Sequence, residues 1–124
     1  MKFIKRLFTW WDGQTIGTQL FTWRRGQLVG SDADGNRFYQ TRDGARRWVV
    51  YDGECDASRV SPDWHGWLHH TYADHPGQSA LTHQTWETPH QQNLTGTALA
   101  YAPAGSLRSE RPADRSDYEA WQPE

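Results

Sequence analysis

The first residues of the chain place apolar and basic side chains on opposite sides of a helix. On a helical wheel of residues 2–11 (KFIKRLFTWW), the large apolar side chains fall within one arc and the basic ones lie across from it. A helix this short is not stable alone in water and has to lie on a surface. Residues 1–12 are therefore predicted to form an amphipathic helix, which rests at a membrane interface, in a groove of a partner or on the chain's own sheet.

After Asp12 and Gly13 the apolar positions alternate with the two-residue period of β-strands. The segments with this pattern are rich in β-branched and aromatic residues and cover 18–23, 27–31, 36–41 and 47–51. Gly26, Gly35 and Gly44 recur at a constant interval, as in hairpins whose turns need a positive φ. The fold class is therefore predicted to be mainly β with little helix, built around a small antiparallel meander of three to four strands. Its last strand is apolar on both faces and is expected to be covered twice.

A second, short helix is predicted near residues 62–70. Ser61 is suited to cap its free backbone N–H groups, and Pro62 suits the first helical position. The side chains that share one face at helical spacing are Trp64, Trp67, Leu68 and Thr71. Gly66 weakens this helix by up to ~1 kcal/mol relative to Ala, which indicates that another group approaches its backbone closely.

Regular patterning stops after residue 76. Isolated apolar residues are then separated by polar residues, Pro and Gly, which is typical of an extended chain that lies on a surface. We expect a flexible linker near residues 107–117 and a short docking peptide around Tyr118 and Trp121. The predicted parts of the chain are the N-terminal helix, the β unit with its short helix, and an extended docking tail, at residues 1–12, 13–75 and 76–124.

The composition explains why a surface-bound chain is expected. Ile, Leu, Val and Phe make up 18 of the 124 residues, which is below the ~20% that usually supports a self-sufficient core. Eight Trp and five Tyr offset this in part, because each large ring can bury ~150–250 Å². The chain is therefore expected to complete its burial on a partner. The alternative is a small β domain with an aromatic core.

Charge, cysteine content and hydropathy argue against several classes of protein. A net charge of −2 and a pI near 6.3 do not favour a nucleic-acid partner. A single cysteine, Cys55, cannot form a disulfide framework and indicates a reducing compartment. No apolar run approaches the ~20 residues that span a bilayer, and Lys5 and Arg6 interrupt any signal-peptide core. The chain is expected to stay on the side of the membrane where it is made.

The residues give little support to catalysis or metal binding. His65 and His69 have the spacing of a metal-binding pair on a helix, but Gly66 stands where a zinc-protease motif has Glu. Hydrogen-bonded or interfacial histidines are therefore favoured. Cys55 is flanked by acidic residues, whose charge disfavours a reactive thiolate. We expect no catalytic residue, no cofactor and no metal.

Several segments together resemble one protein family. They read WVVYDGE, SRVSPDWHGWLHH, TWETPHQQNLTGTALAY and DYEAW, at residues 48–54, 58–70, 85–101 and 117–121. Over residues 7–121 the chain is similar to an accessory subunit of respiratory complex I, the NADH:ubiquinone oxidoreductase alpha-subcomplex subunit 12 family, in its bacterial form.

The resemblance implies a structural role without catalysis or a cofactor. Family members dock on the peripheral arm of complex I, at the cytoplasmic face of the bacterial inner membrane. They contact core subunits there, especially the ferredoxin-like subunit that carries two iron–sulfur clusters, and stabilise the assembled complex in the respiratory electron transport chain. Residues 2–11 can contact the membrane surface in this arrangement. Glu87 and Thr88 replace residues that are commonly basic in relatives, which leaves the charge complementarity of that contact open.

The residues that we expect to dock on the partner are aromatic, apolar or small polar side chains of the helices, the last strand and the tail: Phe3, Leu7, Trp10, Trp11, Trp48, Trp64, His65, Trp67, Leu68, Trp86, Pro89, His90, Asn93, Thr95, Gly96, Tyr101, Tyr118 and Trp121. Two alternatives remain. A related family acts as an assembly factor of complex I, although the PHQQNLTGT and DYEAW segments favour the permanent subunit. A free aromatic ligand-binding module would stack its ligand on Phe38, Tyr39 and Trp48.

Overall fold

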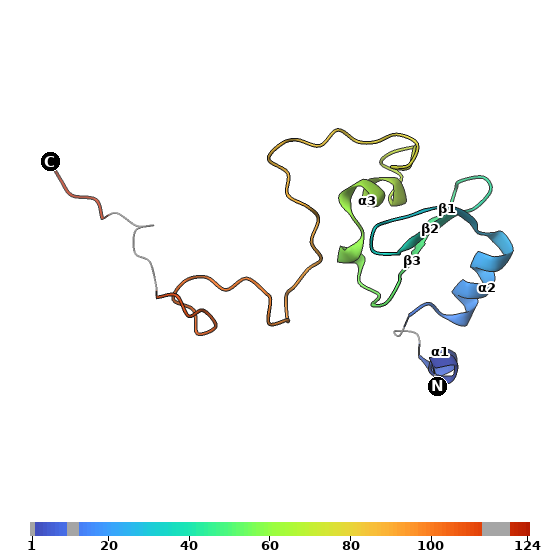
Figure 1. Ribbon diagram of the computed structural model, residues 1–124, viewed down its shortest axis with the longest axis horizontal. Helices are drawn as coiled ribbons and strands as arrows, with labels where there is room; N and C mark the ends of the chain where they lie inside the picture. Colours follow the sequence, from blue (N-terminus) through green and yellow to red (C-terminus); the bar gives the residue numbers. More distant parts are fainter. Residues whose placement is uncertain (1, 10–12, 113–119) are drawn as a thin grey trace. The chain divides into compact units, whose positions relative to one another are not determined.

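The computed structural model describes residues 2–9, 13–112 and 120–124 of the chain (Figure 1). The chain divides into two compact units, residues 1–92 and residues 93–124. The helices and strands of the described residues all lie in the first unit, whereas the described part of the second consists of turns and irregular chain.

The sheet is an antiparallel meander of three strands in sequence order. β1 (Gln27–Ser31) pairs with β2 (Arg37–Gln40), which in turn pairs with β3 (Arg47–Val50). The glycines of the two connecting turns have a positive φ, +83° at Gly35 and +69° at Gly44. The predicted meander and the conformation of these two turns are therefore confirmed.

The segment expected to form the first strand, residues 18–23, is instead part of a helix, α2 (Ile16–Arg25). Thr15 caps this helix, because its hydroxyl accepts a hydrogen bond from the backbone N–H of Thr18 at 3.2 Å. Gly26 follows the helix with a φ of −80°, which is not the turn conformation that was predicted. The prediction of a strand was wrong here. The cap and the packing on the sheet stabilise the helix by more than the weak β-preference of TQLFTW stabilises a strand.

One face of the sheet packs against α3 (Pro62–Leu68) and forms the core. Phe38 is fully buried, and its ring stacks on the indole of Trp64 with centroids 4.1 Å apart and planes within 4°. Trp67 meets Phe38 edge to face at a centroid distance of 6.3 Å. Val60 completes the buried cluster. The core is thus small and largely aromatic.

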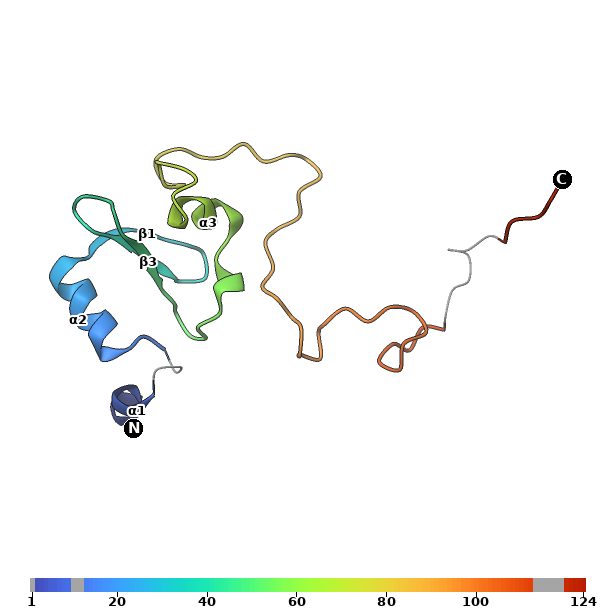
Figure 2. The ribbon, with the colours of Figure 1, turned by 180° about the vertical axis from the view of Figure 1, so that it is seen from behind.

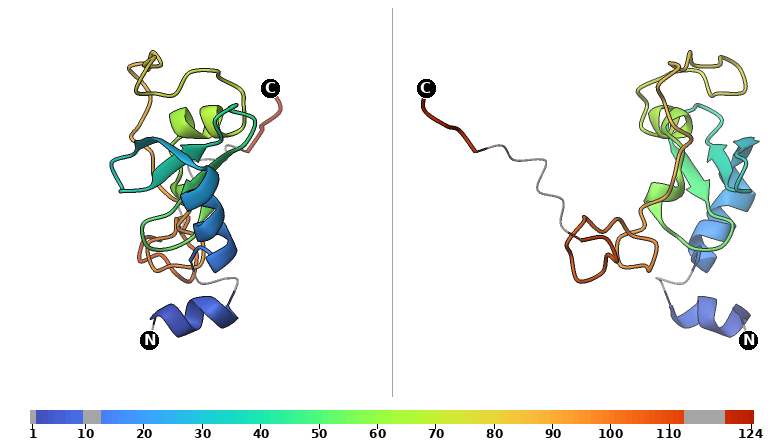
Figure 3. Two further views of the ribbon diagram at one scale, coloured as in Figure 1. Left: turned by 90° about the vertical axis from the view of Figure 1, so that its right-hand side faces the viewer. Right: turned by 60° about the vertical axis from the view of Figure 1, so that its left-hand side comes forward.

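Helix α2 lies on the side of the sheet opposite to α3 (Figures 2 and 3). Trp48 of β3 contacts the rings of Phe21 and Tyr39, at centroid distances of 5.2 and 6.1 Å. Its indole Nε1–H also donates a hydrogen bond to the hydroxyl of Thr22 at 3.0 Å. The last strand is therefore covered on both faces, as predicted, and both covers belong to this chain.

Helix α3 confirms the helix predicted near residues 62–70. Ser61 stands at its N-cap position, but the Ser61 side chain makes no capping hydrogen bond, so that expectation was wrong. Gly66 is buried against the ring of Tyr72, since a Cβ at position 66 would lie 2.2 Å from Cε2 of Tyr72. The close approach that Gly66 indicated is therefore made by a residue of the same chain.

Helix α1 (Lys2–Phe8) is shorter than the helix predicted over residues 2–11, of which residues 10 and 11 lie outside the described residues. The large apolar side chains of α1 are all exposed, from 56% at Leu7 to 81% at Phe8. Among the residues that the structure describes, no helix is long and apolar enough to cross a membrane. The apolar side chains of α1 are thus left uncovered by the described residues.

Candidate partner-docking surface

The chain leaving α3 is held to the sheet by one arginine. Nη1 of Arg47 donates to the carbonyl oxygens of Trp67 at 2.7 Å and Tyr72 at 3.0 Å, and Nη2 donates to the carbonyl of Ala73 at 3.3 Å. The guanidinium group also lies over the Trp67 ring, 4.8 Å from its centroid. Arg47 therefore joins β3 to the carbonyl of Trp67 in the last turn of α3, which also accepts from the backbone N–H of His70, and to two carbonyls of the loop that follows.

Two histidines hold residues 75–90, which follow this loop, against the rest of the first unit. The ring of His75 stacks on the indole of Trp64, with centroids 5.8 Å apart and planes within 5°. Further along, Nε2 of His90 donates to the carbonyl oxygen of Ser58 at 2.7 Å. The chain between residues 75 and 90 thus runs beside α3 although it contains no helix or strand.

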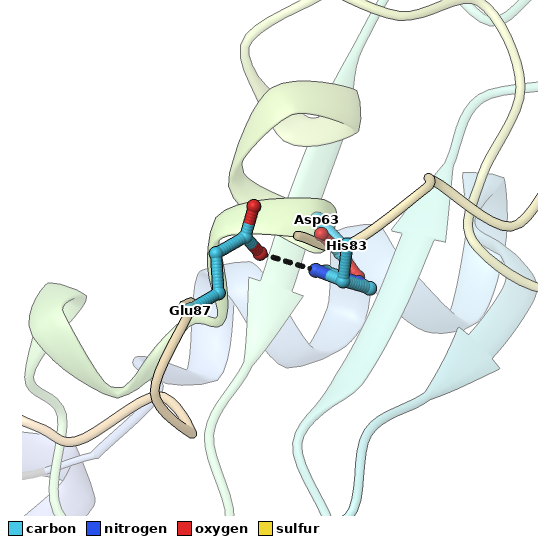
Figure 4. A network of polar contacts seen from close by, with 3 residues as sticks. All are labelled: Asp63, His83 and Glu87. Carbon is cyan, nitrogen blue, oxygen red and sulfur yellow. Dashed lines mark hydrogen bonds and ion pairs between the residues drawn. The ribbon is translucent and has the colours of Figure 1, made fainter. Parts of the chain in front are cut away.

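A third histidine, His83, makes contacts with two carboxylates (Figure 4). Its Nε2 lies 3.0 Å from Oδ2 of Asp63, in the first turn of α3, and its Nδ1 lies 2.7 Å from Oε2 of Glu87. Carboxylates only accept hydrogen bonds, so both contacts are satisfied only by the doubly protonated imidazolium. The hydrogen bond with Glu87, followed by the one with Asp63, accordingly raises the pKa of His83. We call these three side chains the His83 clamp.

An open groove of about 940 Å³ lies between the start of α3 and this segment. The apolar and aromatic residues that line it are Pro62, Tyr72, Leu81, Trp86 and Pro89. The His83 clamp contributes the polar part of the lining. Trp86 is 77% exposed, so most of its indole has no cover within the chain. The groove can therefore accept an apolar side chain of a partner next to a charged one.

Some of the predicted docking residues lie inside the first unit. Trp64 is 7% exposed and Trp67 is 1% exposed, because both pack on Phe38 in the core. Leu68 packs against the same cluster, and Trp48 is half-buried on the other face of the sheet. These four side chains pack inside the first unit and present little surface to a partner in this conformation.

Others among the predicted docking residues are exposed. The exposed fractions are 69% at Phe3, 82% at Trp121 and 88% at Tyr101. His65 is also exposed, with its ring 4.1 Å from that of His69. The remaining exposed members of the predicted set are Leu7, Trp86, Pro89, His90, Asn93, Thr95 and Gly96. Three more, Trp10, Trp11 and Tyr118, lie outside the described residues.

The structure also exposes apolar side chains that the sequence did not identify. Trp23 and Leu20 of α2 are 82% and 58% exposed, and Leu28 of β1 is 61% exposed. Leu20 and Trp23 were assigned to one strand and Leu28 to the next, and this assignment does not indicate which of these side chains stay exposed. The signal for α2 is Thr15, whose hydroxyl can cap a helix that begins at the next residue.

The described residues contain little that could perform chemistry. Cys55 is exposed and has no disulfide partner. Within residues 2–9, 13–112 and 120–124, no three His, Cys, Asp or Glu side chains are grouped so that they could hold a metal ion. His65 and His69 contact each other as a pair only.

Comparison with known proteins identifies similar chains. The family model described as NADH ubiquinone oxidoreductase subunit NDUFA12 matches residues 26–123. A protein of Dictyostelium discoideum named NADH dehydrogenase (ubiquinone) 1 alpha subcomplex subunit 12 is 38% identical over 78 residues, which cover 59% of this chain and 56% of that protein. Proteins of the same name from Bos taurus and Mus musculus are 37% and 35% identical over 88 residues.

These matches are partial in length. The alignments with the bovine and mouse proteins cover 60% of this chain and 60% of each relative. The chain thus spans 56% to 60% of the length of these relatives. The matched region of the family model begins at Gly26 and therefore includes the sheet, α3 and residues 75–90.

Proposed function

The chain belongs to the family of NADH ubiquinone oxidoreductase subunit NDUFA12, and from this premise we propose that it is a non-catalytic accessory subunit of complex I. In this role it docks on the peripheral arm of the enzyme and stabilises the assembled complex in the respiratory electron transport chain. Its partners are core subunits of that arm, above all the ferredoxin-like subunit with two iron–sulfur clusters. Its place is the cytoplasmic face of a bacterial inner membrane, where residues 2–11 contact the membrane surface.

The observation that carries this proposal is the exposure of large apolar side chains after α3. Trp86 and Leu99 are each 77% exposed, and Tyr101 is 88% exposed. Burying a ring of this size on a partner removes ~150–250 Å² from water, and each Å² of apolar surface contributes about 25 cal/mol. These side chains stay largely exposed within the described chain, so a partner supplies the apolar surface that covers them.

The stabilisation follows from mass action. A subunit that binds the assembled arm, and not its separated parts, shifts the equilibrium toward the assembled state. A central interface Trp such as Trp86 typically contributes ~2–4 kcal/mol to binding. Loss of that ring therefore weakens docking by roughly 30- to 1,000-fold, since each 1.4 kcal/mol is about tenfold.

The two units contribute differently to the docking surface. In the first unit, the groove with Trp86 takes an apolar partner side chain, and the acidic groups of the His83 clamp favour a basic residue beside it. In the second unit, Tyr101 and Trp121 act as separate anchors on irregular chain. Several anchors on one chain raise the overall affinity because each bound anchor holds the next one nearby.

The test compares two tryptophans that are equally exposed but lie in different places. Trp86→Ala removes the ring of the groove, and Trp23→Ala removes a ring from α2 that is 82% exposed. Tagged full-length variants replace the native protein in cells, membranes are extracted with mild detergent, and native gels are probed for the tag and for NADH dehydrogenase activity. We expect the wild-type chain and Trp23→Ala to migrate with complex I and Trp86→Ala to be largely lost from it.

The same gels distinguish the alternatives. If the wild-type chain migrates free of an intact, active complex I, the proposed role as a subunit is refuted. If it is found only with partly built complexes, it is an assembly factor. If Trp86→Ala stays bound as well as Trp23→Ala does, the groove is not the docking site.

A further inference from the structure

A second hollow of the first unit differs from the docking groove in its charge. It is an open cleft of about 960 Å³ between the end of α2 and the turn that joins β2 to β3. The charged and aromatic residues of its lining are Arg24, Arg25, Arg42, Arg46, Asp43 and Phe21. We call this hollow the arginine cleft.

The guanidinium groups of the four arginines make no hydrogen bond and no ion pair with the residues that the structure describes. All four side chains are exposed. The guanidinium of Arg46 is placed over the ring of Phe21, 6.0 Å from its centroid. Like charges that surround one opening repel each other, and an anion bound between them lowers this repulsion.

The single acidic residue of the lining does not neutralise the cleft. The carboxylate of Asp43 accepts hydrogen bonds within its own turn, from the hydroxyl of Thr41 and from the backbone N–H of Ala45. These hydrogen bonds lower the pKa of Asp43, so it is ionised at neutral pH. Four arginines against one aspartate leave a net charge of +3 in the cleft, in a chain whose net charge is −2. Four of the thirteen Lys and Arg residues of the chain thus line this one cleft.

We infer that the arginine cleft binds the phosphate groups of anionic phospholipids at a membrane surface. A guanidinium group presents a planar fork of donors that matches a phosphate oxygen pair. The arginines come from two separate elements that face one opening, so they can contact neighbouring headgroups at the same time. The ring of Phe21 adds an apolar contact at the headgroup level.

The openness of the cleft favours a lipid surface over a soluble phosphate. Each exposed guanidinium competes with water and salt for a single free phosphate, which makes such a contact weak. A bilayer presents many phosphates in one plane, and the attraction of each arginine to an anionic surface then adds to that of the others. Helix α1 supports the same ligand independently, because it combines exposed Phe3 and Leu7 with Lys5 and Arg6.

The test measures binding of the purified full-length chain to vesicles. Phosphatidylcholine vesicles are compared with vesicles that also contain phosphatidylglycerol, in a flotation assay at low and high salt. Arg24→Gln/Arg42→Gln removes two charges from the cleft. Arg37→Gln/Arg111→Gln removes two charges from exposed arginines that do not line the cleft. Tryptophan emission of each variant checks that Trp48 and the core remain packed.

We expect binding only to the anionic vesicles, weakened by salt and by roughly fivefold for each cleft arginine removed. The control pair keeps most of the wild-type binding. The inference would be overturned if the cleft variant and the control variant lost vesicle binding equally. It would also be overturned if the wild-type chain bound neutral and anionic vesicles equally. It is also overturned if inorganic phosphate displaces the chain from vesicles better than chloride at equal ionic strength, which indicates a soluble ligand. Loss of the cleft variant from complex I with unchanged vesicle binding would assign the cleft to an acidic protein partner instead.

Discussion

Replacing Arg47 by Met removes the guanidinium group that joins the sheet to the end of α3. In the wild-type chain this group donates to three carbonyl oxygens, those of Trp67, Tyr72 and Ala73, and lies over the Trp67 ring. Met keeps much of the unbranched stem of Arg, so packing along the side chain is largely preserved. The substitution therefore tests the polar contacts rather than the volume of the side chain.

The expected loss can be worked out from these contacts. The two shorter hydrogen bonds, to Trp67 and Tyr72, each contribute about 1.5 kcal/mol at the lower end of the range for charged donors. The contact with the Trp67 ring adds ~1 kcal/mol. Nε of Arg47 is buried without a hydrogen-bond partner, and removing it recovers ~1–2 kcal/mol of its desolvation cost. The free energy of unfolding should thus fall by about 2–3 kcal/mol, a large share of the ~5–15 kcal/mol typical of a domain.

Urea unfolding followed by tryptophan fluorescence measures this loss. With a denaturant slope of ~1–3 kcal/mol per M, the midpoint should fall by roughly 0.7–3 M. Arg46→Met is the matched control, because Arg46 is adjacent in sequence and exposed, and its guanidinium donates no hydrogen bond within the described residues. It should change the free energy of unfolding by no more than ~0.5 kcal/mol. If both variants unfold within ~0.5 kcal/mol of each other, Arg47 does not hold α3 in the way described.

Two further predictions concern residues 81–90 and the core. The pKa of His83 is raised above its ordinary value of 6.5. The clamp is therefore complete below about pH 6.5 and is lost as pH rises through the raised pKa. Glu87 stays ionised over this range, because its hydrogen bond with His83 lowers its pKa. Protection of residues 81–90 against hydrogen exchange, relative to the intrinsic exchange rate at each pH, should fall as pH rises through the raised pKa of His83 in the wild-type chain. A His83→Gln variant with the same pH dependence of protection would contradict this. Gly30→Ala should lower the free energy of unfolding by ~1–3 kcal/mol, because its Cβ would lie 2.8 Å from Cη2 of Trp64. Gly17→Ala, on α2, should instead raise it by up to ~1 kcal/mol, because a Cβ there would meet only the Thr15 hydroxyl oxygen, at an ordinary contact distance of 3.9 Å. Equal midpoints for the two alanine variants in urea would refute the packing argument.

The sequence predicted the elements whose causes are local. The turns at Gly35 and Gly44 need a positive φ, and glycine is the residue that adopts it at little cost, so the hairpins could be placed correctly. The helix at α3 was found from the spacing of its large side chains and from Pro62. In α2 the local signals conflicted. The residues of TQLFTW favour strands, whereas Thr15 caps a helix, and the contact that helps to fix α2, between Thr22 and Trp48, joins residues far apart in the chain.

The docking surface was predictable only in part, because it also depends on contacts between residues that are far apart in the chain. Helical spacing shows that Trp64 and Trp67 share a face, but not that Phe38 covers this face. Trp23 has the same side chain and is left exposed, because α2 contacts the sheet through Phe21 and Thr22. The His83 clamp joins α3 to a residue in irregular chain, and no sequence spacing indicates that contact.

The amino-acid sequence alone determined the family resemblance, the meander, the short helix and the shortage of apolar surface for a large core. These depend on composition and on conformational preferences that act over a few residues. Only the tertiary structure decided which aromatic rings are buried in the core and which stay exposed, and which arginines gather around one cleft. Burial and charge clustering depend on residues that are distant in sequence and meet only after the chain has folded. The local sequence around each residue therefore does not predict them.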